Sequence, residues 1–93
     1  MLKIVDNKIY NDGEKIGWID GNSHAWDKYE KKLGYWQGNY IYNVNARKVA
    51  YIQENLLKFE NGNASISLEK INEEIHGTYP LIVKCAVHVL FED

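Results

Sequence analysis

Short apolar runs alternate with polar turns through the first two-thirds of the chain, and the pattern recurs about every sixteen residues. Each unit holds two runs rich in β-branched and aromatic residues, which suit a pleated, half-buried surface. The first runs are Ile9-Tyr10, Ala25-Trp26, Tyr40-Ile41-Tyr42 and Leu57-Lys58-Phe59. The second runs are Ile16-Gly17-Trp18-Ile19, Leu33-Gly34-Tyr35-Trp36 and Val49-Ala50-Tyr51-Ile52. The units are therefore predicted to be antiparallel β-hairpins that stack on one another, because one copy cannot bury its own apolar face.

Turn residues and small residues recur in phase with these runs. Asp12-Gly13 is a tight-turn signal within the first unit, and Asp20-Gly21-Asn22 separates the first unit from the second. A small residue occupies the same position in the second run of each of the first three units. Inside a strand such a residue marks a bend or a close backbone approach. The three residues are Gly17, Gly34 and Ala50. We expect seven or eight short strands, arranged either around an axis or as a flat meander.

The period changes to a helical one at Ser67. Leu68, Ile71 and Ile75 follow at i, i+3 and i+7, which places them on one face of a helix. Ser67 can cap the N-terminus, and Gly77 is a natural stop at the C-terminus. A helix of about ten residues is predicted here.

The last apolar run, Leu81 to Phe91, fits two kinds of element. As a helix it follows Pro80 and carries Lys84 and His88 as a narrow polar stripe. As a strand it has one continuous apolar face, which its Ile and Val content favours. Periodicity does not decide between the two, although Pro80 and the length of the run favour a helix. Either element must be nearly surrounded, by the hairpins or by another subunit.

The repeat resembles that of small bacterial proteins called four-fold β-flowers. The similarity lies in Asn7-x-Ile9-Tyr10 followed by Gly13-x-Lys15-Ile16-Gly17-Trp18, repeated over roughly residues 5–60 and followed by a short apolar segment. This resemblance implies a flower-like set of about four hairpins, a bacterial source and a helical tail, and it brings no known activity. The expected fold is α+β, with a β-hairpin repeat region at residues 5–66 and a C-terminal helical region at 67–93.

Composition narrows the class of protein. Ninety-three residues with 45% hydrophobic content make a single domain, 1–93. Cys85 is the one cysteine, so no internal disulfide forms, which fits a cytoplasmic protein. A net charge of −2 with interspersed signs predicts no nucleic-acid partner. The apolar run at the end is too short to span a membrane, and the N-terminus shows no secretory signal.

The sequence carries no catalytic or cofactor signature. His24 lies near Asp20 and Asp27, but a metal site needs three or more convergent ligands, so we predict no metal. Cys85 and His88 are three residues apart, yet their apolar neighbours predict a buried, inert thiol. No phosphate-binding loop or nucleophile elbow is present, so no catalytic residue and no cofactor are predicted.

The aromatic residues and the apolar tail are the remaining candidates for function. The rings either pack between hairpins or form a surface that binds a ligand such as a glycan. The candidate ligand-binding residues are Trp18, Trp26, Trp36, Tyr35 and Tyr51. The candidate interface residues of a homo-oligomer or protein complex are Leu81, Val83, Val87, Leu90 and Phe91. The sequence favours a non-enzymatic interaction or assembly module, with a ligand-binding module as the alternative.

Overall fold

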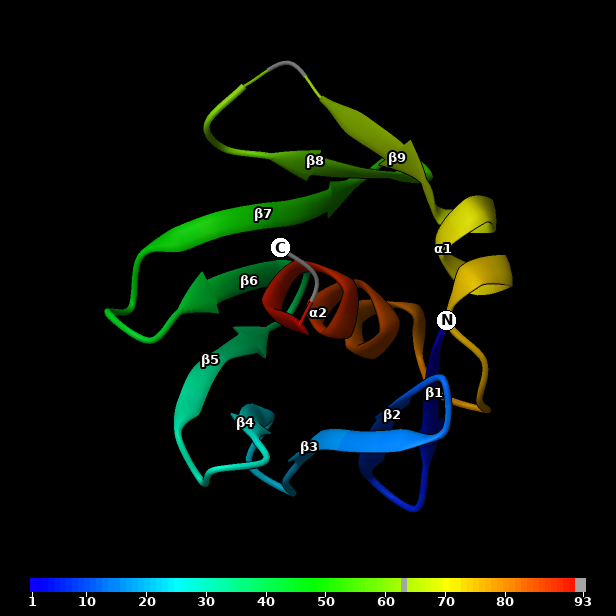
Figure 1. The fold of residues 1–93 in the computed structure, drawn as a ribbon. Coiled ribbons are helices and arrows are strands. Elements are labelled where there is room, and N and C mark those ends of the chain that lie inside the picture. The colour runs from blue at the N-terminus through cyan, green and yellow to red at the C-terminus, as the bar shows by residue number, and fades with distance from the viewer. Residues whose placement is uncertain (63, 92–93) are drawn as a thin grey trace.

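The computed structural model describes residues 1–62 and 64–91, which form one sheet and two helices (Figure 1). Nine antiparallel strands follow one another in chain order across the sheet. The strands are β1 (Leu2–Val5), β2 (Lys8–Asn11), β3 (Glu14–Ile19), β4 (His24–Asp27), β5 (Lys32–Gln37), β6 (Tyr40–Asn43), β7 (Lys48–Gln53), β8 (Leu56–Phe59) and β9 (Ser65–Ser67). The helices are α1 (Leu68–Glu74) and α2 (Leu81–Phe91). The predicted α+β fold of repeated hairpins followed by two helices is confirmed.

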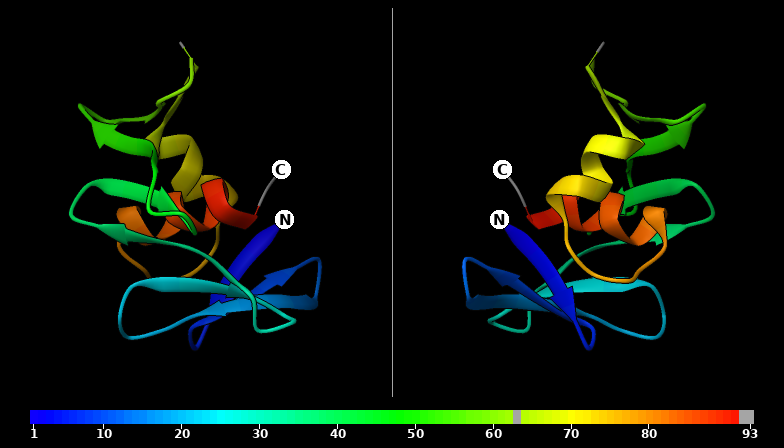
Figure 2. Two further views of the ribbon diagram at one scale, coloured as in Figure 1. Left: turned by 90° about the vertical axis from the view of Figure 1, so that its left-hand side faces the viewer. Right: turned by 90° about the vertical axis from the view of Figure 1, so that its right-hand side faces the viewer.

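The sheet curls around α2, which lies at its centre in Figure 1. The side views of Figure 2 show the helix between the part of the sheet formed by the first strands and the part formed by the last. Beyond α1, the backbone of His76 lies alongside β1. The Ile4 N–H donates to the His76 carbonyl at 2.9 Å, and the His76 N–H donates to the Leu2 carbonyl at 3.1 Å. The segment after α1 therefore closes the ring between β9 and β1.

The repeat in the sequence is also a repeat of hydrogen bonds. At four equivalent places, a carbonyl of a turn between units accepts from the N–H at the end of the next hairpin. The pairs are Asn7–Ile19 at 2.8 Å, Ser23–Trp36 at 3.1 Å, Asn39–Ile52 at 2.9 Å and Asn55–Leu68 at 3.0 Å. The residues that point inward from the first strand of each unit are fully buried. They are Ile9, Ala25, Ile41 and Leu57, sixteen residues apart. Four structurally equivalent units thus surround the central helix.

Small residues bring the sheet close to α2. A Cβ at Gly34 would fall against the Tyr42 carbonyl oxygen and 2.9 Å from a methyl of Leu90. A Cβ at Gly17 would likewise fall against the Trp26 carbonyl oxygen and the Phe91 ring. The two glycines therefore make the space that the last turn of the helix fills.

The N-terminal and fourth units add strands that bring the total to nine rather than seven or eight. β1 pairs with β2 across the turn at Asp6 and Asn7, so residues before the first recognisable unit also form a strand. β9 supplies the second run of the fourth unit and pairs with β8. Both had weak strand signals, since each is short and lacks an aromatic residue.

The first helix is shorter than predicted. Ser67 caps it as expected, because its hydroxyl accepts from the Lys70 N–H at 3.1 Å. The helix then ends at Glu74 rather than at Gly77, and Ile75 adopts an extended conformation. Pairing of His76 with β1 pulls the chain out of the helix at this point. Tertiary hydrogen bonds therefore set this boundary, and the glycine does not.

The run from Leu81 to Phe91 is helical, which settles the alternative that periodicity left open. The sheet surrounds it, and Val83, Cys85, Ala86 and Val87 belong to the core. Lys84, one of the two residues of the predicted narrow polar stripe, is also buried.

Candidate functional site

Strand register places aromatic and basic residues in four rows across the outer face of the sheet. Each row joins residues that are directly opposite one another on neighbouring strands. We call them the outer rows: Lys3–Tyr10–Lys15; Val5–Lys8–Trp18–Trp26–Lys32; His24–Tyr35–Tyr42–Lys48; and Gln37–Tyr40–Tyr51–Lys58–Ser65. No member of these rows belongs to the core cluster or packs against it. The rows therefore form the face of the sheet that looks away from α2.

The rings in the outer rows stack mainly on one another. Trp18 and Trp26 are nearly parallel, with centroids 6.2 Å apart and planes 9° apart. Tyr35 and Tyr42 stack at 4.8 Å and 10°, and His24 meets Tyr35 edge-on at 5.7 Å. Cross-strand pairs of this kind stabilise a sheet. Each stacked pair therefore covers part of one face of each of its two rings.

A lysine stands over an aromatic ring in each of three successive units. The Lys15 ammonium lies 5.6 Å from the Trp18 ring centroid, and the Lys32 ammonium lies 5.4 Å from that of Tyr35. Lys48 repeats the arrangement at 5.6 Å from Tyr51. Such cation–π contacts hold the ammonium groups close to the ring surface.

The outer rows are strongly positive although the whole chain is not. Their seventeen positions contain six lysines and His24, and none of them is an aspartate or glutamate. Carboxylates reach the rows from outside at two places: Glu60 lies 3.2 Å from the Lys48 ammonium, and Asp20 lies 2.8 Å from the Trp26 indole nitrogen and 3.8 Å from His24 Nδ1. The hydrogen bond to Glu60 raises the pKa of Lys48 above its usual value. A chain with a net charge of −2 therefore concentrates its cations on one face.

Asp20 anchors the second row from the turn before β4. Its carboxylate accepts from the Trp26 indole N–H at 2.8 Å and from the backbone N–H groups of Asn22 at 2.8 Å and His24 at 3.0 Å. Burial alone would raise the pKa of Asp20, but these hydrogen bonds and the nearby imidazole outweigh it and hold the pKa below its usual value. Asp20 thus fixes the edge of the Trp18–Trp26 stack.

Four of the five candidate ligand-binding residues lie in the outer rows: Trp18, Trp26, Tyr35 and Tyr51. Trp36 does not join them, because it packs against the core on the opposite face of β5. The sequence reasoning missed the lysines. Their signal was present, since Lys15, Lys32 and Lys48 each precede an aromatic residue of the rows by three positions.

The candidate interface residues are mostly covered by their own chain. Val83 and Val87 are buried in the core, and Leu90 and Phe91 pack against it beside Gly34 and Gly17. Leu81 is the exception, with 39% of its surface exposed.

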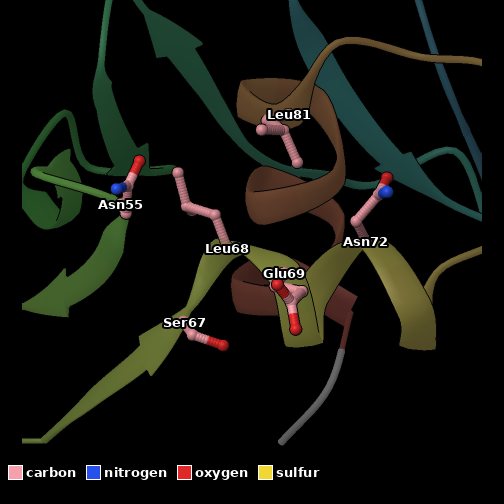
Figure 3. Close-up of a pocket in the computed structure, with 6 residues that line it drawn as sticks. All are labelled: Asn55, Ser67, Leu68, Glu69, Asn72 and Leu81. Carbon is pink, nitrogen blue, oxygen red and sulfur yellow. The ribbon is translucent and has the colours of Figure 1, made fainter.

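Leu81 lies at the rim of a cavity between the two helices (Figure 3). The cavity has a volume of about 570 Å³, and it is lined by Asn55, Ser67, Leu68, Glu69, Asn72 and Leu81. The close-up shows Asn72 on α1 with its amide directed toward the start of α2.

Other chemistry is sparse in the part of the chain that the structure describes. Within residues 1–62 and 64–91, no three His, Cys, Asp or Glu side chains are grouped to hold a metal ion. No helix in the same ranges is long and apolar enough to cross a membrane. Cys85 is buried as predicted, and desolvation raises the pKa of its thiol to about 11. The thiol therefore stays protonated near neutral pH and is a poor nucleophile.

Comparison of the chain with protein-family models, curated proteins and solved structures gives no match. The outer rows themselves are therefore the basis for a functional proposal.

Proposed function

We propose that this protein is a non-enzymatic binding module and that its outer rows bind an acidic glycan. The observation that carries the proposal is the charge of the rows, with six lysines and no carboxylate in seventeen positions. Cations gathered on one face attract a polyanion even when the net charge of the protein is slightly negative. The equivalent lysines of successive units suit a ligand whose negative charge also repeats.

The covering of the ring faces favours a glycan over a single-stranded nucleic acid. Proteins that bind single strands stack bases on open aromatic faces. In the outer rows Trp18 stacks on Trp26 and Tyr35 stacks on Tyr42, so one face of each of these rings is already used. Tyrosine hydroxyls and lysine ammonium groups remain, and they can hydrogen-bond to sugar hydroxyls and carboxylates without ring stacking.

The experiment measures binding of a polygalacturonate oligosaccharide, which carries one carboxylate per sugar, by fluorescence anisotropy. We expect saturable binding that weakens as salt rises from about 50 mM to about 200 mM. A variant with Lys15→Gln, Lys32→Gln and Lys48→Gln should bind at least about tenfold more weakly. The matched control, with Lys28→Gln, Lys31→Gln and Lys70→Gln, has the same net charge but leaves the outer rows intact.

Equal losses in the two triple variants would mean that only net charge matters, and they would contradict the proposal. Absence of binding to the wild-type protein would also contradict the proposal. Dextran serves as the uncharged reference glycan in the same assay. Tighter binding of DNA than of the oligosaccharide would replace the glycan by a nucleic acid and would also overturn the sequence-based expectation.

Assembly through α2 is the other function that the sequence suggested, and we propose it only in a restricted form. Four of the five candidate interface residues already pack within the chain, so a homo-oligomer would have to use other surfaces. Light scattering over a hundredfold dilution measures the molar mass directly. A stable oligomer would direct attention to the subunit boundaries, and a constant mass of 10.8 kDa would leave the outer rows as the binding surface.

We further infer that the chain belongs with the four-fold β-flowers that its repeat resembles. Supporting this assignment are the four equivalent turn hydrogen bonds and the position of α2 inside the ring of hairpins.

A further inference from the structure

Lys84 is the one buried charged side chain among the residues that the structure describes, with 4% of its surface exposed. It lies in the second turn of α2 and faces α1. Its ammonium donates to the Asn72 side-chain oxygen at 2.8 Å. No carboxylate of residues 1–62 or 64–91 forms an ion pair with it. The fold therefore holds a positive charge beside a neutral amide.

This arrangement is costly for stability alone. An ammonium group has three donors, and Asn72 accepts from one of them. Removing such a charge from water without an opposite charge is unfavourable, and an apolar side chain would fill the same place on α2 without that cost. A ligand with a negative charge would supply the opposite charge that Lys84 lacks within the chain.

An open cavity gives such a ligand access. It has a volume of about 680 Å³ and is lined by residues of α1, the connecting segment and α2: Asn72, Glu73, His76, Gly77, Thr78, Tyr79, Pro80 and Lys84. Lys84 and Asn72 thus form part of one wall. Because an ammonium only donates, the Asn72 amide must turn its oxygen toward Lys84, which leaves its NH₂ group to donate elsewhere.

We propose that Lys84 and Asn72 bind a carboxylate group in this cavity. One carboxylate oxygen accepts from the Lys84 ammonium, and the other accepts from the Asn72 NH₂ group. A singly charged carboxylate matches the single cation, whereas Glu73 on the same wall disfavours an anion with two charges. The ligand class is a small molecule or chain end that carries a carboxylate, and the site is separate from the outer rows.

The test follows the Asn72 side-chain NH₂ signals by NMR while sodium acetate is added to the full chain at constant ionic strength, with sodium chloride in the reference titration. We expect a saturable shift with acetate and a smaller, unsaturated response to chloride or phosphate. Lys84→Met should weaken acetate binding at least about tenfold. The triple variant of Lys15, Lys32 and Lys48 to Gln should bind acetate like the wild type, so this site and the glycan surface fail independently.

A second variant keeps the test decisive if Lys84→Met does not fold. Asn72→Ala removes an exposed side chain and retains the cation, and it should weaken acetate binding, monitored by the backbone N–H signals of His76 and Gly77. A linear response of the wild type to acetate would overturn the proposal. So would equal binding of acetate by the wild type and by either folded variant, or tighter binding of phosphate than of acetate.

Discussion

Gly34 lies where β5 passes close to both β6 and the central helix, and neither neighbour leaves room for a side chain there. A methyl group there would meet the carbonyl oxygen of Tyr42, which the strand pairing fixes, as well as Leu90. Gly17 has the same role beside Phe91. The third unit solves the problem differently, because Ala50 fits a methyl group into the equivalent position and is fully buried.

We predict that Gly34→Ala lowers the free energy of unfolding by about 3 kcal/mol, since backbone atoms cannot move aside as a flexible side chain can. Urea denaturation followed by tryptophan fluorescence measures the change. Gly21→Ala is the matched control, because a Cβ at Gly21 meets no atom within 4 Å. A loss as small as that of the control would show that β5 and β6 can separate at no cost.

Ala46 stores strain in the turn between β6 and β7. Its φ of +62° lies in the left-handed region, which an alanine occupies at a cost and a glycine does not. We predict that Ala46→Gly raises the free energy of unfolding by about 0.5 kcal/mol, after the greater flexibility of glycine in the unfolded chain is counted.

The same substitution at Ala50 should have the opposite sign. Ala50 is fully buried within a strand, so Ala50→Gly removes a packed methyl group and should cost about 1 kcal/mol. Thermal or urea unfolding of the two variants compares them directly. If Ala46→Gly destabilised the protein as Ala50→Gly does, the positive φ of Ala46 would not be a source of strain.

Asp20 makes stability depend on pH. Its pKa is depressed in the folded protein, so its carboxylate stabilises the fold above pH 3.8, and that contribution is lost as pH falls further. We predict that the stability difference between the wild type and Asp20→Asn shrinks as pH falls from about 5 to about 2. Urea unfolding at several pH values measures it. A difference that does not change with pH would exclude this carboxylate as the cause, and Asp6→Asn, in the exposed turn between β1 and β2, is a suitable comparison.

At the scale of elements, the local sequence pattern predicted the hairpins well, but it did not predict β1 or the end of α1. Runs such as Lys48–Gln53 combine β-branched and aromatic residues between turn signals, so their strand character is local. β1 lacks an aromatic residue, and only its pairing with β2 and with His76 identifies it as a strand. The early end of α1 has the same origin, because a hydrogen bond to a strand far away in the chain competes with the helix.

The residue types of the candidate site could be predicted from the sequence, but the side of the sheet that each residue faces could not. Trp18 and Tyr35 each follow the glycine of their unit and lie in the outer rows, whereas Trp36 holds the place of Ile19 and packs against the core. A β-bulge lies in β3 and its equivalents, and each bulge changes which side of the sheet the following residues face. Sequence alternation alone cannot locate such a shift, so the lysine rows became apparent only from strand register.

At the scale of the whole molecule, α2 is the core that four hairpin units share. A meander of short strands buries little of its own inner face without it, so we predict that a chain ending at Thr78 does not fold cooperatively. Circular dichroism during heating should show no sigmoidal transition and little native sheet signal. Leu81→Gln, which changes an exposed residue of the same helix, should keep the transition. A cooperative transition in the shortened chain would mean that the ring of hairpins is stable without the helix.

The central position of α2 also bears on how the protein is made. Translation delivers every strand of the sheet before the helix around which the sheet is wrapped. Until α2 emerges from the ribosome, the hairpins that precede it carry apolar inner faces, including Ile9 and Ile41, that α2 does not yet cover. Hairpins with exposed apolar faces are prone to aggregate, so the interval between synthesis of the sheet and synthesis of α2 is the period of greatest aggregation risk for the nascent chain.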